Sequence, residues 1–120
     1  MTPGSPKRGE IWKVDFNPTI GAEIQKQRPA VVISSDAIGK LPLRIVAPVT
    51  GWKETFENNL WHVRLLPTAS NGLQKTSAVD AFQVRSVSTD RFLAALGKIT
   101  AAELDEITEA LGLLIEIPQN

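Results

Sequence analysis

The stretch QKQRPAVVISS, residues 25–35, combines a polar approach, an Arg28-Pro29 pair and four consecutive apolar residues. A short apolar run of this kind is typical of a strand that is buried on both faces. The residue before a proline is pushed toward extended conformation, and proline is tolerated at the first position of a strand. We therefore expect Arg28 just outside this strand, with its side chain outside the core.

Alternation with a period of two predicts further strands. In EIWKVDF, residues 10–16, Trp12, Val14 and Phe16 fall on one side, and Lys13 and Asp15 fall on the other. Short strands are also predicted in AVVIS, LRIVAPV, LWHVRLL, SAVDAF and QVRSV, which are separated by Gly, Pro, Asn and Lys clusters. Many short strands at near-regular spacing predict a mainly β fold, a small β-barrel.

The C-terminal stretch ITAAELDEITEALGLLIEI, residues 99–117, changes to helical spacing. Its apolar positions are Leu104, Ile107, Leu111 and Leu114, and Thr100 and Glu103 form a T-x-x-E capping box. One amphipathic helix is therefore predicted to close the chain. We expect a flexible N-terminal lead over residues 1–8 and a single domain over residues 9–117.

Composition narrows the function classes. The 120-residue chain is the size of one domain, and its 13 basic and 13 acidic side chains cancel, so any nucleic-acid site must be local. With no cysteine and one histidine, disulfides, thiolate chemistry and a histidine-rich metal site are excluded, and we expect no metal and no cofactor. No apolar run reaches the roughly 20 residues of a membrane span, and no signal peptide is evident, so a cytoplasmic protein is expected.

Two residues from neighbouring strands are predicted to meet at one end of the barrel. An antiparallel hairpin centred near Gly39 pairs residues whose numbers sum to about 78, which sets Arg28 opposite Thr50. A guanidinium beside a hydroxyl suits a phosphate oxygen. On these residues alone, the more frequent situation is a solvated arginine at a strand end and a threonine that closes the turn before Gly51.

Four stretches together resemble the ribonuclease toxins of the MazF, PemK and Kid family. They are KRGEIWKVDFNPTIGAEIQKQRPAVVIS, IVAPVT, SAVDAFQVRSVSTDRF and LGKITAAELDEITEALGLL, in the order found in the family. The resemblance implies an SH3-like barrel of the CcdB/PemK-like type with a C-terminal helix, and a homodimer. It also implies metal-independent, sequence-selective cleavage of single-stranded RNA, which inhibits translation and growth. A cognate antitoxin would neutralise the toxin with an acidic flexible segment laid over the RNA groove.

The resemblance assigns the family's catalytic arginine to Arg28 and its catalytic threonine to Thr50. RNA carries its own nucleophile in the ribose 2′-OH, so cleavage to 2′,3′-cyclic phosphate and 5′-OH ends needs positioning and charge stabilisation rather than a metal. A guanidinium stays protonated in proteins, so Arg28 is expected to stabilise charge rather than accept a proton. A two-histidine scheme is excluded, because His62 is the only histidine and is interpreted as an ordinary strand residue.

RNA contacts are predicted at four further positions. The resemblance places Glu23 and Gln83 near the RNA, where a carboxylate and an amide suit base recognition. Lys26 would attract and position the RNA backbone, and Trp52 would stack on a base. Each residue also has an interpretation without RNA. Glu23 would be a loop carboxylate in water, Gln83 a polar strand residue and Lys26 a solvated lysine. Trp52 would pack over the barrel mouth or across a dimer interface.

The sequence departs from the family at Phe82, where many members carry an acidic residue before the glutamine. Asp80, on the same strand face, is a possible substitute. Arg85 is expected to hold structure. Two other functions stay open: a gyrase-poisoning toxin of the same fold, and a catalytically inactive RNA- or protein-binding module.

Overall fold

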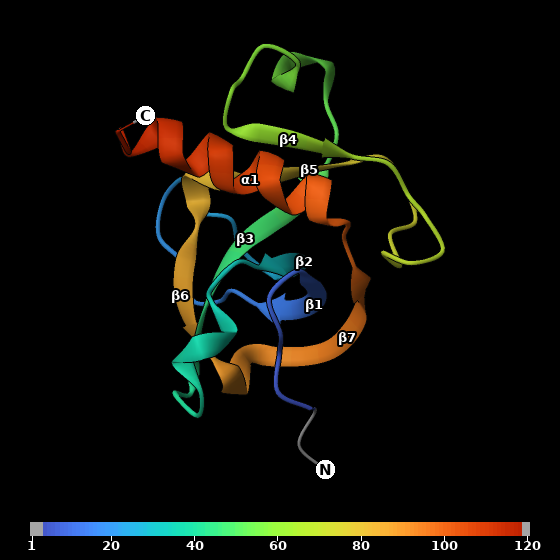
Figure 1. The fold of residues 1–120 in the computed structure, drawn as a ribbon. Coiled ribbons are helices and arrows are strands. Elements are labelled where there is room, and N and C mark those ends of the chain that lie inside the picture. Colours follow the sequence, from blue (N-terminus) through green and yellow to red (C-terminus); the bar gives the residue numbers. More distant parts are fainter. Residues whose placement is uncertain (1–3, 119–120) are drawn as a thin grey trace.

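The computed structural model describes residues 4–118 as seven strands, one α-helix and four single 3-10 turns (Figure 1). The strands are β1 (Glu10–Asp15), β2 (Gln27–Val32), β3 (Leu43–Gly51), β4 (His62–Leu65), β5 (Ser77–Asp80), β6 (Arg85–Ser88) and β7 (Phe92–Lys98). The helix is α1 (Ala101–Leu114). The 3-10 turns are η1 (Asp36–Ile38), η2 (Glu54–Phe56), η3 (Ala81–Gln83) and η4 (Thr89–Arg91).

All strand pairs are antiparallel and form one curved sheet in the order β4-β5-β3-β2-β1-β7. Strand β3 is long enough to pair with β6 through its first half and with β5 through its second half. The prediction of a mainly β fold with a C-terminal helix is confirmed. Within residues 4–118 no ladder joins β4 to β7, so the sheet curls around its core without closing into a hydrogen-bonded barrel (Figure 1).

Strands β2 and β3 lie at the centre of the sheet, and residues 30–32 of β2 and 46–49 of β3 are buried. Val31 and Ala47 face one apolar cluster, which α1 covers with Ile107. Ala30 and Val32 face a second cluster on the other side. That second cluster also contains Trp12, Val14, Phe16, Val46, Val87 and Phe92. The two clusters account for the uninterrupted apolar run of β2 and fix the β2–β3 hairpin firmly in place.

The predicted hairpin register is confirmed. Ala30 pairs with Pro48, and the next two pairs keep the same sum of residue numbers, 78. Extending this register brings Arg28 opposite Thr50, at the open end of the hairpin. The expectation that Arg28 lies just outside the strand is wrong, because β2 begins at Gln27 and Arg28 pairs with Val14 of β1.

Two strand predictions need correction. The predicted strands SAVDAF and QVRSV are interrupted by η3, because the Asp80 carboxylate accepts a hydrogen bond of 3.0 Å from the Phe82 N–H and caps a 3-10 turn. Strand β7 was not predicted. Its sequence FLAALGK shows no alternation, since only Phe92 is buried and the pairing with β1 contains two register shifts.

The capping box at the start of α1 is confirmed: Thr100 and Glu103 exchange side-chain-to-backbone hydrogen bonds.

No helix within residues 4–118 is both long and apolar enough to cross a membrane. The boundary between lead and domain stays a prediction. Residues 1–3 lie outside the described residues, and Ser5 and Pro6 hydrogen-bond to Arg44 of β3.

Candidate active site

A groove of about 630 Å³ lies at the open end of the β2–β3 hairpin. It brings together three predicted site residues, Arg28, Thr50 and Trp52. The rest of its lining comes from Ile24, Gly51, Lys53, Phe56, His62, Lys75 and Asp80. We call this site the Arg28 groove. The hairpin register and the β3–β5 ladder place its floor, because Thr50 pairs with Ala78 of β5.

Arg28 is half-buried and its guanidinium is oriented by the neighbouring loop. Its Nε donates a hydrogen bond of 2.9 Å to the Gln25 carbonyl, and its two Nη groups make no hydrogen bond to any residue in 4–118. The Thr50 hydroxyl donates to the Gly51 carbonyl at 3.1 Å and can turn about its side-chain torsion to reach a ligand. The pair therefore offers a fork of N–H donors and a hydroxyl donor to an anion.

The groove has a positive charge balance that the chain as a whole lacks. Its lining contains three cations, Arg28, Lys53 and Lys75, and one carboxylate, Asp80. Both lysines are exposed. The sequence analysis did not predict either lysine as a site residue. Lys53 lies close to Thr50 along the chain, but Lys75 reaches the groove only because β5 pairs with the end of β3.

Aromatic rings form one wall of the groove. The Trp52 ring meets Phe56 edge-on with ring centroids 6.0 Å apart, and the Arg64 guanidinium lies 5.1 Å from the Trp52 ring. Phe56 in turn stacks on His62 with ring centroids 3.7 Å apart. Trp52 therefore packs against this wall, and its half-exposed ring borders the space for a ligand.

His62 lies at the base of this wall, between Asn59 and Asp80. Its Nδ1 is 3.1 Å from the Asn59 Nδ2, which places the ring proton of the neutral form on Nε2. That Nε2 lies 3.7 Å from an Asp80 carboxylate oxygen. Burial lowers the His62 pKa below its usual 6.5, and the attraction of Asp80 only partly opposes this effect.

The lowered His62 pKa predicts acid destabilisation. Unfolded protein binds a proton on this histidine more readily than folded protein, so its contribution to the free energy of unfolding is complete above pH 6.5. The contribution should decline as the pH falls through 6.5 toward the lower folded pKa. Urea unfolding of wild type and His62→Gln across this range should show wild type losing stability relative to the variant. A stability difference that is constant with pH would contradict this assignment.

Glu23 and Gln83 lie in an adjoining pocket of about 470 Å³, not in the Arg28 groove. Phe82 and Arg85 also line this pocket, and Ile24 lines both sites. The remaining lining is Phe16, Ala22, Pro48 and Val84. We call this site the Phe82 pocket. Its position extends the Arg28 groove along the β1–β2 loop, residues 16–26.

The Gln83 side chain holds the β1–β2 loop in place. Its Oε1 accepts from the Ile24 N–H at 2.7 Å, and its Nε2 donates to the Ala22 carbonyl at 3.0 Å. Glu23 accepts from the Ile20 N–H at 2.6 Å. Lys26 is exposed, has a φ of 72° and lines neither site. The predicted RNA contacts of these side chains stay predictions.

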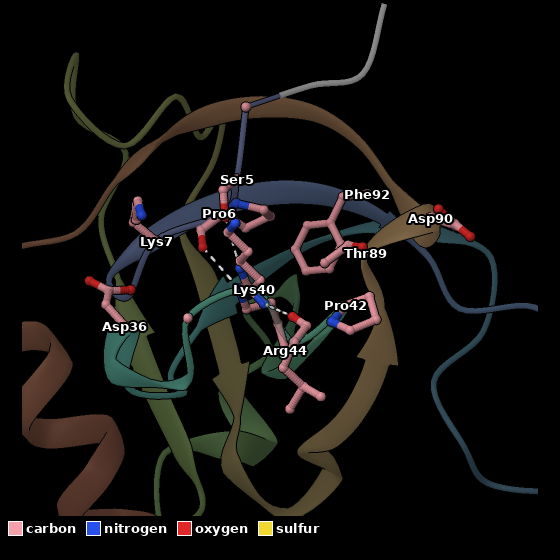
Figure 2. Close-up of a pocket in the computed structure, with 13 residues that line it drawn as sticks. Ser5, Pro6, Lys7, Asp36, Lys40, Pro42, Arg44, Thr89, Asp90 and Phe92 are labelled. Carbon is pink, nitrogen blue, oxygen red and sulfur yellow. Dashed lines mark hydrogen bonds between the residues drawn. The ribbon is translucent and has the colours of Figure 1, made fainter.

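A cavity of about 720 Å³, larger than the Arg28 groove, lies at the opposite, closed end of the hairpin (Figure 2). Its central cation is Arg44, which is 6% exposed. Figure 2 shows this guanidinium turned toward backbone carbonyls, and it donates to Pro6, Leu41 and Leu43 and to the Ser5 hydroxyl. Arg44 therefore fastens the N-terminal segment to the hairpin loop, and we do not consider this cavity the active site.

Comparison with protein families agrees with the geometry. Residues 7–115 match the model of the PemK-like, MazF-like toxins of type II toxin–antitoxin systems. The chain belongs to this toxin family. Across residues 4–118, His, Asp and Glu side chains form no group of three that could hold a metal ion.

Individual relatives of the toxin cover nearly its whole length. It is 38% identical over 121 residues to the endoribonuclease MazF9 of Mycobacterium tuberculosis, with 92% of this chain and 97% of the relative covered. A crystal structure of MazF from Deinococcus radiodurans superimposes with a TM-score of 0.79 at 29% identity and covers 93% and 97% of the two chains. A Deinococcus MazE–MazF structure gives a TM-score of 0.73 at 28% identity, covering 94% and 98%.

These comparisons confirm the family resemblance and the class of function, an endoribonuclease toxin of the MazF and PemK type. They favour RNA cleavage over gyrase poisoning, since the relatives of the toxin are named endoribonucleases.

Proposed function

We propose that the toxin cleaves single-stranded RNA at preferred sequences, without a metal ion, by attack of the RNA's own 2′-OH. The observation that carries this proposal is the meeting of Arg28 and Thr50 in one cation-lined groove. A duplex has its bases stacked and paired, whereas an unpaired strand can present both its phosphates and its base faces to a groove of cations and rings.

The chemistry follows from the donors in the groove. The 2′-hydroxyl gives up its proton to solvent as its oxygen bonds to phosphorus, the bond from phosphorus to the 5′-oxygen breaks, and the 5′-oxygen takes a proton from solvent, which leaves a 2′,3′-cyclic phosphate and a 5′-OH. Negative charge on the equatorial oxygens rises in the transition state. The Arg28 Nη groups are positioned to stabilise this charge, and the Thr50 hydroxyl donates to the same phosphate once it turns from Gly51. Lys53 and Lys75 hold the neighbouring phosphates.

Partners follow from the same proposal. The Deinococcus relative has been solved as a MazE–MazF assembly, and a cation-lined groove on the present toxin suits an acidic, flexible antitoxin segment. We propose that such a segment covers the Arg28 groove and blocks RNA entry. We also propose that the toxin acts as a homodimer in the cytoplasm, where mRNA cleavage stops translation and growth.

Cleavage in the presence of a chelator tests the proposal. A defined RNA should be cut at an undiminished rate in EDTA, because the substrate supplies the nucleophile and Arg28 supplies the positive charge. The fragments should carry 2′,3′-cyclic phosphate and 5′-OH ends, which mass spectrometry identifies. Loss of cutting in EDTA with recovery on adding magnesium, or fragments with 5′-phosphate ends, would refute the mechanism.

A further inference from the structure

We infer that Phe82, supported by Trp61, is a stacking site for one unpaired base of the RNA strand held in the Arg28 groove. This inference rests on the proposed function and adds to it a specificity site. The residue that carries it is an exposed phenylalanine in the lining of the Phe82 pocket.

Phe82 is an exposed aromatic residue held in a fixed position. Its side chain is 66% exposed, the largest exposure of any phenylalanine or tryptophan in residues 4–118. Its backbone N–H is bound by the Asp80 carboxylate at 3.0 Å, and its ring meets Trp61 edge-on at 6.0 Å and 81°. An exposed ring that is already ordered loses little conformational entropy when a ligand covers it.

A continuous series of ring contacts joins Phe82 to the Arg28 groove. Trp61, which touches Phe82, lies 5.8 Å from His62 between ring centroids. His62 stacks on Phe56, and both of these residues line the groove. Asp80 is a second structural link between the Arg28 groove and Phe82, because it lines the groove and caps the 3-10 turn that carries Phe82. Ile24 lines both the groove and the Phe82 pocket, so we expect a strand with a phosphate at Arg28 to extend into the Phe82 pocket.

The Phe82 pocket has the chemistry of a nucleotide site rather than that of a site for a carboxylate-rich peptide. Its walls include the apolar residues Ile24, Pro48 and Val84, and it contains one cation, Arg85, and one carboxylate, Glu23. Apolar walls suit the face of a base, and a guanidinium suits the adjoining phosphate. An extended acidic peptide would instead need several cations, and Arg85 is the one cation in this lining.

Stacking also determines the kind of selectivity expected here. The Gln83 amide, the polar group nearest to Phe82 in sequence, is already bound at both ends to the backbone of Ala22 and Ile24. The Glu23 carboxylate, which also lines the pocket, accepts from the Ile20 N–H, so the contribution inferred for Phe82 is stacking on the face of a base. Recognition by stacking tolerates all bases and favours those with larger rings. We expect a preference for a purine at one position near the cut.

The test measures binding and cleavage of short RNAs by Phe82→Ala and Phe82→Trp. Binding is measured with an RNA that carries 2′-deoxyribose at the scissile nucleotide, so that it stays intact. Phe82→Ala should weaken binding roughly 5-fold to 100-fold, as removal of a stacked ring does, and should abolish the purine preference. Phe82→Trp should retain both. Leu66→Ala is the matched control, since Leu66 is also a large exposed apolar residue, at 58%, and lines neither site.

Three results would overturn the inference. If Phe82→Ala binds RNA as wild type does while cleavage still depends on Arg28, the stacking site is wrong and the proposed function stands. If Phe82→Ala sediments as a monomer while wild type is a dimer, or loses only antitoxin binding, the ring is a protein contact. If wild type neither binds nor cuts any RNA, the proposed function fails and the stacking site fails with it. Melting temperatures confirm that each variant is folded.

Discussion

Replacing Arg28 by alanine is expected to slow single-turnover RNA cleavage about a hundredfold to a thousandfold while leaving the toxin folded. Loss of one preorganised donor to a developing charge costs roughly 3 to 4 kcal/mol of transition-state stabilisation. The folded state loses one hydrogen bond from a half-buried side chain to the Gln25 carbonyl, which is worth about 1 kcal/mol. Cleavage rates and melting curves of the same preparations separate the two effects.

Further variants locate this effect in the guanidinium. Arg28→Lys should recover part of the rate, since it keeps the charge but lacks the two-pronged donor geometry. Thr50→Val, which is nearly isosteric, should also be slow, and the double variant should lose less than the sum of the two effects if both groups hold one phosphate. Lys98→Ala on β7 is the control for removing an exposed cation. A folded Arg28→Ala toxin that cuts at the wild-type rate would place the active site elsewhere.

An RNA with 2′-deoxyribose at the scissile nucleotide is expected to resist cleavage by more than about a thousandfold. The change removes the nucleophile, and an attacking oxygen already held next to phosphorus is worth many orders of magnitude over a nucleophile from solution. Binding should change little, because Arg28, Lys53 and Lys75 face phosphates in the proposed complex. The measurement is a time course of cleavage at saturating toxin.

The matched control carries its single 2′-deoxyribose one nucleotide further along, where it should be cut at close to the normal rate. Cutting of the scissile-site deoxy substrate at an undiminished rate would show that water or a protein side chain attacks the phosphorus. That outcome would reject the 2′-OH mechanism without contradicting the fold or the family of the toxin.

Local sequence patterns predicted the part of the fold that carries the proposed catalytic pair. The apolar run of β2 and its counterpart in β3 specify strands buried on both faces, and a single register buries them both. That register is sufficient to bring Arg28 and Thr50 to the same end of the β2–β3 hairpin. The capping box of α1 could also be predicted from local sequence, since Thr100 and Glu103 are only three residues apart.

Features that depend on distant contacts could not be predicted in this way. Strand β7 is an edge strand with mostly exposed residues, so it has no alternating pattern to mark it. Lys75 reaches the groove only through strand pairing with β3. The two hydrogen bonds of Gln83 span 59 and 61 residues, and nothing around Gln83 indicates that its amide binds loop backbone.

The Gln83 contacts have a bearing on which substitutions the β1–β2 loop tolerates. The amide binds the peptide groups of Ala22 and Ile24, so these two contacts hold the β1–β2 loop without depending on the side chains at positions 22 and 24. Substitution of Ala22, which is exposed and held through its backbone carbonyl, should therefore not displace Arg28, whose guanidinium depends on the carbonyl of the same loop at Gln25. A side chain introduced at position 22 would change the lining of the Phe82 pocket while the backbone of the loop stays in place.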